Sequence, residues 1–226
     1  MIKFDDITKI YSPKTIALKN ISFEVAKGEF LLIIGKSGAG KTTLIRLLER
    51  EEKPTFGKIF YNNEDISEIK TSKLPLYRRK LGVVYQDYKL LPQMNVFENV
   101  SFAMMVTGKS DSEIRNSVPK ILEIVDLAHK INNFPNQLSS GEKQRLAIAR
   151  AIVNQPEVIL ADEPTGNLDC YFALDIVHLL EKINQLGTTV ILATHDRDLV
   201  NNLRKRVITL QDGEIIRDDK EGKLIF

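Results

Sequence analysis

The chain has 226 residues, and 43% of them are hydrophobic, which is enough apolar side chain for the core of one large domain. Its 32 Lys and Arg residues and 30 Asp and Glu residues leave a formal net charge of only +2. This balance is too small for a protein that grips nucleic acid through phosphate contacts, so we expect no nucleic-acid partner.

The sequence has a single cysteine, Cys170, which cannot form an intrachain disulfide and so fits a reducing compartment. Residues 1–4 lead directly into a strand-like pattern without an apolar signal core. The densest apolar runs, 30–34 and 158–161, are far shorter than the ~20 residues of a membrane-spanning helix. We therefore expect a cytoplasmic chain whose membrane role, if any, needs a separate partner chain.

The N-terminal region predicts two strands followed by a strand–loop–helix unit. Residues 2–4, 7–11 and 16–25 alternate in strand fashion, and Ser12-Pro13-Lys14 breaks the pattern after residue 11. The run 30–34 has no polar face, which indicates a central parallel strand covered on both sides. A glycine loop and a predicted helix over 41–48 come next.

Strands and helices continue to the C-terminus, with strands expected at 57–61, 81–85, 158–162 and 189–194, helices at 96–106, 114–127 and 171–186, and a closing strand pair around 211–214. We predict one α/β domain over 1–226. Its core comprises 1–86 and 154–226, and a mostly helical subdomain, 87–153, interrupts it.

The loop Gly35-Lys36-Ser37-Gly38-Ala39-Gly40-Lys41-Thr42, with Thr43 after it, fits the pattern G-x-x-x-x-G-K-S/T between a buried strand and a helix. Glycines let successive backbone N–H groups curl around a phosphate, and the helix start adds partial positive charge. We expect ATP here, with Lys41 on the β- and γ-phosphates and the Thr42 hydroxyl on Mg²⁺. A plain glycine turn would have no reason to end in Gly-Lys-Thr-Thr.

Two adjacent carboxylates, Asp162 and Glu163, end the second buried strand. Asp162 is expected to hold Mg²⁺ through its bound water, and Glu163 to act as the general base facing the γ-phosphate. The alternative is a capping pair ahead of the turn at Pro164, which the phosphate loop upstream makes less attractive.

Three further side chains are candidates for the same site. The Gln86 amide follows a strand and could touch Mg²⁺ and the attacking water, although a surface glutamine is the simpler interpretation. His195 stands at the carboxyl end of a parallel strand, where ligands gather in such sheets, or is a satisfied capping histidine. Tyr11 could stack on adenine or belong to the core.

The segment Leu138-Ser139-Ser140-Gly141-Glu142-Lys143-Gln144-Arg145 resembles the signature sequence of the ATP-binding cassette (ABC) family. The resemblance runs from Tyr11 to the end of the chain. It implies a P-loop NTPase fold with a RecA-like mixed sheet, an N-terminal antiparallel β region and a helical subdomain. It also implies an adenine-stacking role for Tyr11, a Q-loop role for Gln86, a D-loop ending in Asp169 and a switch role for His195. Two positions depart from the commonest form: Ser140 replaces a glycine and Glu142 replaces a glutamine.

The signature segment begins far along the chain from the phosphate loop, so its helix dipole and the Ser139 hydroxyl can best meet a γ-phosphate held by a second copy. Ser139, Ser140, Gly141 and Glu142 are therefore expected to bind the partner's ATP. We predict a homodimer that forms on ATP binding and opens after hydrolysis.

Within the family, residues 83–92, 96–100, 194–201 and 204–207 are similar to the bacterial cell-division ATPases. This similarity implies an integral membrane permease of the FtsX type and a peripheral position on the cytoplasmic face of the cell membrane at the division site. The lipoprotein-release and macrolide-export ATPases share several of these features and stay open as alternatives. A soluble ABC switch without a permease, or a P-loop kinase, fits less well.

We expect the permease to bind the surface between Gln86 and Val106. Four apolar residues, Leu90, Leu91, Met94 and Phe97, are too many for a solvated loop and could form a groove for a partner helix. They could equally pack the helical subdomain.

Overall fold

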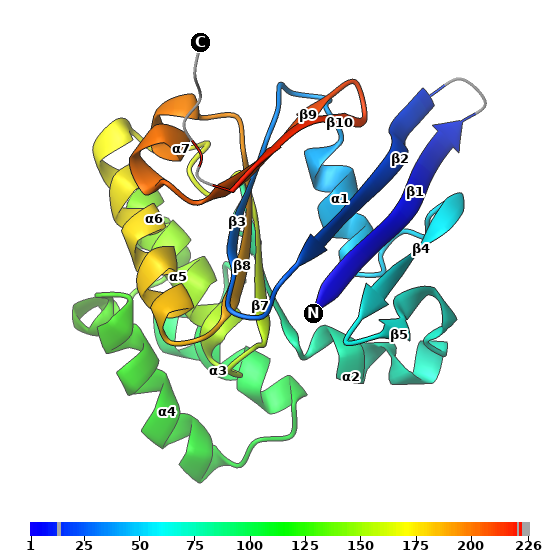
Figure 1. Cartoon of the computed structure of the whole chain (residues 1–226). Helices are drawn as coiled ribbons and strands as arrows, with labels where there is room; N and C mark the ends of the chain where they lie inside the picture. The colour runs from blue at the N-terminus through cyan, green and yellow to red at the C-terminus, as the bar shows by residue number, and fades with distance from the viewer. Residues whose placement is uncertain (13–14, 221, 223–226) are drawn as a thin grey trace.

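The structure is a computed structural model that describes residues 1–12, 15–220 and 222. A helix lies between two sheets, and further helices cover the outer face of the larger sheet (Figure 1). Pro13 and Lys14, part of the break expected in the N-terminal region, lie outside the described residues.

The smaller sheet is antiparallel and has the order β2-β1-β4-β5. Its long strands pair because β1 and β2 are consecutive and alternate buried and exposed side chains along much of their length. The members are β1 (Ile2–Ser12), β2 (Thr15–Val25), β4 (Phe56–Tyr61) and β5 (Glu64–Asp65). This sheet is the N-terminal antiparallel region that the sequence predicts.

The larger sheet has the order β10-β9-β3-β8-β7-β6, in which all neighbours are parallel except the β9–β10 hairpin. Every residue of β3 and β8 is buried, as expected of strands covered on both faces. The members are β3 (Phe30–Ile34), β6 (Leu81–Tyr85), β7 (Val158–Asp162), β8 (Thr189–Thr194), β9 (Arg206–Gln211) and β10 (Glu214–Asp219). The mixed α/β fold is confirmed.

The α-helices of the described residues are α1 (Lys41–Leu48), α2 (Leu74–Arg78), α3 (Val96–Val106), α4 (Asp111–Ile124), α5 (Ser140–Ile152), α6 (Cys170–Gln185) and α7 (Arg197–Leu203). Short 3-10 turns occupy 66–68, 71–73, 128–130 and 135–137. Helix α4 begins three residues before the predicted Ile114, because Ser110 and Glu113 form a capping box at its start.

Two hydrophobic clusters lie on the two faces of the larger sheet. One joins α1 and the smaller sheet to the larger sheet, and includes Phe4, Leu44 and Ile191. The other joins α3 to α6 to the opposite face, and includes Val100, Leu146 and Leu192. Figure 1 shows α1 on one side of the larger sheet and α3, α5 and α6 on the other.

Helices α3, α4 and α5 all fall within 87–153, the range predicted as a helical subdomain. Their buried residues share one cluster with strands of the core, so packing is continuous across the proposed boundary. The division into core and subdomain therefore stays a prediction. None of the helices in the described part of the chain is both long and apolar enough to span a membrane.

Candidate nucleotide site

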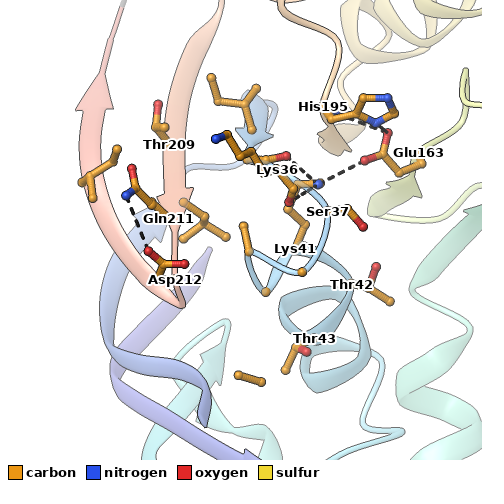
Figure 2. Close-up of a pocket in the computed structure, with 18 of the residues that line it drawn as sticks. Lys36, Ser37, Lys41, Thr42, Thr43, Glu163, His195, Thr209, Gln211 and Asp212 are labelled. Atoms are coloured by element: carbon orange, nitrogen blue, oxygen red, sulfur yellow. Dashed lines mark hydrogen bonds and ion pairs between the residues drawn. The ribbon is translucent and has the colours of Figure 1, made fainter. Parts of the chain in front are cut away.

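A cavity of about 890 Å³ opens where β3 ends and α1 begins. Figure 2 shows the phosphate loop between Glu163 and His195 on one side and Thr209 and Gln211 on the other. The lining residues are Gly35 to Thr43, Ala17, Ile34, Gln86, Glu163, His195, Thr209, Leu210, Gln211, Asp212 and Ile216. All eight residues of the predicted phosphate loop, and Thr43, therefore lie in one cavity.

The phosphate loop leaves the start of α1 open. Gly40, the N-cap residue, has a φ of 106°, and no side chain of the described residues caps the helix there. A Cβ on Gly40 would lie 2.6 Å from the Leu18 side chain and 2.7 Å from the Ala17 carbonyl oxygen. Glycine is thus required both for the backbone angle and for the close packing, and the first N–H groups of α1 stay available for an anion.

Lys41 is 6% exposed and is held by three oxygens. Its Nζ donates to the carbonyl of Gly35 at 2.7 Å and to that of Lys36 at 3.2 Å, and it lies 3.2 Å from Oε1 of Glu163. The ammonium group therefore points along the inside of the loop toward the carboxylate (Figure 2). The role of Lys41 on the β- and γ-phosphates stays a prediction.

Glu163 is fixed from two sides. Its backbone N–H donates to the Ala193 carbonyl at 2.9 Å, and its φ of 49° is in the left-handed region, which a residue with a side chain adopts only at a cost. Oε1 faces Lys41, while Oε2 lies 2.9 Å from Nδ1 of His195 and accepts from the His195 N–H at 3.3 Å. Glu163 and His195, which are far apart in sequence, thus contact each other at the cavity, and their catalytic roles stay predictions.

Asp162 does not line the cavity, but its side chain hydrogen-bonds with that of Thr42. Its Oδ1 is buried and has no hydrogen-bond partner among the described residues, and burial raises the pKa of the carboxyl group. An unpartnered carboxylate oxygen beside a hydroxyl is a suitable donor set for a hard divalent cation. Thr42 and Asp162 therefore fit the Mg²⁺ that the sequence predicts, and Gln86 lines the same cavity as Thr42.

The remaining predicted site residues do not line this cavity. Tyr11 is 43% exposed, and Nζ of Lys9 lies 4.9 Å from its ring centroid. Asp169 caps α6 by accepting from the N–H groups of Tyr171 and Phe172, each at 3.1 Å. The adenine-stacking role of Tyr11 and the D-loop role of Asp169 stay predictions.

The signature residues form the exposed start of α5. The N–H of Ser139 donates to Oε2 of Glu142 at 2.8 Å, and the N–H of Glu142 donates to the Ser139 hydroxyl at 3.3 Å, which is a capping box. Gly141 lies against Phe172, whose ring would be 3.2 Å from a Cβ there. Ser139 and Ser140 are exposed, outside the cavity of their own chain.

Sequence reasoning missed the wall of the cavity opposite Glu163. Ala17 comes from β2, Thr209 to Gln211 end β9, Asp212 is in the following turn, and Ile216 lies in β10. This wall forms because β9 lies beside β3 in the larger sheet. That order is a tertiary feature, which no local sequence pattern shows.

A phosphate loop on a parallel α/β sheet, with an acidic pair and a histidine at the neighbouring strand ends, defines a P-loop nucleotide-binding domain. Residues 18–166 match the family model described as ABC transporter, and the chain belongs to this family.

The chain is also similar to curated proteins along nearly its whole length. It is 49% identical over 223 residues to the cell division ATP-binding protein FtsE of Bacillus subtilis, covering 99% of this chain and 98% of that protein. It is 43% identical over 215 residues to the protein of the same name from Escherichia coli, covering 95% and 97%.

Solved structures agree with this assignment. The dimeric structure of a cassette described as a bacterial ABC transporter cassette matches with a TM-score of 0.89 and 37% identity, covering 99% of this chain and 100% of that one. A dimeric post-hydrolysis state bound to ADP and Pi matches with the same TM-score and 36% identity, with the same coverage. The chain therefore has the fold of an ABC ATPase.

Proposed function

We propose that this chain is the Mg²⁺-dependent ATPase subunit of a membrane complex that acts in bacterial cell division. The observation that carries the ATPase part is the Glu163 carboxylate, held between Lys41 and His195 at the mouth of the phosphate loop. The division part is supported by the similarity to FtsE proteins over nearly the full chain.

In the proposed reaction, a water oxygen attacks the γ-phosphorus of ATP, the bond from that phosphorus to the β–γ bridging oxygen breaks, and ADP and phosphate result. Glu163 accepts the proton of the attacking water, and His195, 2.9 Å from its carboxylate, keeps that group oriented. Lys41 offsets negative charge on the phosphates. Thr42, Asp162 and Gln86 would hold Mg²⁺, which neutralises phosphate charge when bound.

The second part of the proposal is a homodimer with two ATP molecules at its interface. Ser139 and Ser140 stand exposed at the start of α5, outside their own cavity, so that a second copy can carry them to a γ-phosphate. The relatedness to a dimeric cassette supports this arrangement. Release of phosphate would then let the two copies separate.

The third part is a permease of the FtsX type, which would place the chain at the cytoplasmic face of the membrane at the division site. A second cavity, of about 620 Å³, lies between α2, β6, α3 and α5 and would receive a cytoplasmic segment of that permease. Its lining includes the exposed Val106, and Arg79 and Arg150, which donate to backbone carbonyls. An apolar segment with acidic residues would complement these groups.

The receiving surface differs in detail from the prediction. Leu90 and Phe97 pack against the core cluster, and none of the four apolar residues expected there lines the second cavity. Val106 and Lys89, which lie within the predicted range, do line it. The predicted location is therefore kept in the proposal, with different contact residues.

The test is capture of the partner from membranes. The Glu163→Gln variant, tagged and expressed in the source bacterium, should retain ATP, form a dimer and recover an FtsX-type permease after detergent extraction. Recovery of a lipoprotein-release or macrolide-export permease instead would assign the chain to export, and a dimer without any permease would indicate a soluble switch. Hydrolysis at the wild-type rate by Glu163→Gln would remove Glu163 from its role.

A further inference from the structure

Glu49 follows α1 and is a buried carboxylate. It is 4% exposed, and its Oε2 accepts a hydrogen bond from the Tyr85 hydroxyl at 3.1 Å. Its Oε1 is buried and has no hydrogen-bond partner among the described residues, and burial raises the pKa of Glu49 to about 7. A buried, half-satisfied carboxylate destabilises a fold, which favours a functional reason for its presence.

Tyr85, the hydrogen-bond donor, stands at the junction of the two cavities. It lines the second cavity, and Gln86, the next residue, lines the nucleotide cavity. Tyr85 also ends β6 and pairs in register with Asp162 of β7. Tyr85 is thus adjacent in the chain to a residue of the nucleotide cavity and paired in the sheet with the residue that precedes Glu163.

The same end of α1 is tied to α2. The Tyr77 hydroxyl donates to the Leu48 carbonyl at 2.6 Å, and Arg78 donates from Nε to the Glu49 carbonyl at 3.0 Å and from Nη2 to the Arg50 carbonyl at 3.1 Å. These carbonyls lie at a helix end, where intrahelical donors run out. Arg78 lines the second cavity, so residues around that cavity hold the helix whose first turn carries Lys41 and Thr42.

We propose that Glu49 and Tyr85 form a positioning pair that sets the place of Gln86 in the nucleotide cavity. The role of Gln86 in hydrolysis rests on the proposed function, whereas its placement by the pair does not.

The first test compares ATP turnover by the purified chain and by Tyr85→Phe, which removes the hydroxyl and keeps the ring. Gln86 is expected to act on the reacting water more than on ATP binding. The kcat should therefore fall roughly fivefold to tenfold, while KM for ATP stays within about twofold. A change in KM alone would overturn the proposal.

Tyr61→Phe is the matched control, because the Tyr61 hydroxyl also donates to a glutamate, Oε2 of Glu157, at 2.8 Å. Neither Tyr61 nor Glu157 lines either of the two cavities described above. We expect Tyr61→Phe to lower the melting temperature without changing kcat. Equal kcat values for Tyr85→Phe and Tyr61→Phe would show that the hydroxyl of Tyr85 is merely structural.

Substitutions of Glu49 complete the experiment. Glu49→Gln keeps an acceptor for the hydroxyl and should retain most of kcat, whereas Glu49→Leu should lose as much as Tyr85→Phe. The double variant Glu49→Leu with Tyr85→Phe should be no slower than either single variant, because both remove one interaction. Additive losses in kcat would contradict the pairing.

These measurements use the chain alone, so they separate this inference from the proposed function. An unchanged kcat in Tyr85→Phe, together with capture of the permease, would overturn only the positioning pair. The expected kcat loss in a chain that captures no permease would overturn only the proposed partner.

Discussion

Helices α1 and α5 both begin where a phosphate is expected, but their first turns differ. The start of α1 is capped by Gly40 in a left-handed conformation, and it faces into the large cavity. The start of α5 is closed by its own side chains through the Ser139–Glu142 capping box and is exposed. The first is a preformed anion site, whereas the second has already satisfied part of its donors.

The charges around the two helix starts differ in the same sense. Lys41 supplies a cation at the start of α1, while Glu142 places a carboxylate at the start of α5. This carboxylate accepts a hydrogen bond from the Ser139 N–H, which lowers the pKa of Glu142. Lys130 and His129 lie 3.7 and 3.9 Å from this carboxylate. On the proposed function, ATP affinity would reside at α1, and α5 would contribute only after two copies have met.

The largest effect should come from Lys41→Ala, which removes the cation from the open helix start. Loss of charge-assisted bonds to phosphate corresponds to ~3 kcal/mol, or roughly 100-fold weaker ATP binding. Calorimetric titration with ATP measures this change. Lys19→Ala, which breaks only a surface pair with Glu214, is the control, and equal affinities for the two variants would refute the assignment.

The closed helix start can be tested by Ser139→Arg. Its bulk should prevent the dimer from forming while ATP binding stays within about twofold of wild type, because Ser139 lies outside the cavity of its own chain. Light scattering with ATP, in a Glu163→Gln background, reports the dimer. Ser110→Arg is the matched control, since Ser110 and Glu113 form an equivalent capping box on α4, and this variant should still dimerise.

The far end of α1 provides a pH-dependent test. The pKa of Glu49 is raised from 4.5 to about 7, so the folded state holds this proton more tightly and the unfolding free energy falls as pH rises from about 4.5 to about 7. Glu49→Gln lacks this cost and should be more stable than wild type by about 2–3 kcal/mol at pH 8. Urea unfolding at pH 8 and pH 4.5 measures the difference in unfolding free energy between Glu49→Gln and wild type. If this difference did not shrink at pH 4.5, ionisation of Glu49 would not be its cause.

The smallest effect is expected from Glu142→Gln, which removes a negative charge from the closed helix start and keeps an acceptor for the Ser139 N–H. The ATP-dependent dimer should become tighter by roughly threefold, because the variant removes one repulsive contact at a solvated surface, between the carboxylate and the γ-phosphate of the second copy. Sedimentation with ATP measures the dimer constant. Glu113→Gln, the corresponding change on α4, should leave it unaltered; weaker dimerisation of Glu142→Gln would show that the carboxylate assists closure.

Much of the fold can be predicted because its central strands are uninterrupted apolar runs. The bounds expected for β3, β6, β7 and β8 agree with the structure to the residue, since glycine, proline or a change to polar residues ends these segments. The sequence predicts the start of α4 three residues too far along the chain, which shows that apolar periodicity does not locate the end of a helix. The apolar spacing begins at Ile114, but the helix begins at its cap, Ser110.

The candidate site could be predicted on one wall only. The phosphate loop, Glu163 and His195 follow buried strands, and the carboxyl ends of parallel strands share one edge of a sheet. Thr209, Gln211 and Ile216 come from a late hairpin whose position beside β3 depends on strand order. The unpartnered oxygen of Asp162 depends on packing around its carboxylate, which a linear motif does not specify.

The left-handed backbone of Glu163 carries a trade-off between durability and turnover. Glycine would relieve the torsional cost at this position, which is of order 1 kcal/mol or more, but it would abolish the carboxylate. The buried Lys41 ammonium would also lose its carboxylate partner, and this loss opposes the relief of backbone strain. A glycine at position 163 would therefore exchange a strained backbone for an unpaired buried cation, and the strain at Glu163 persists because the carboxylate is needed there.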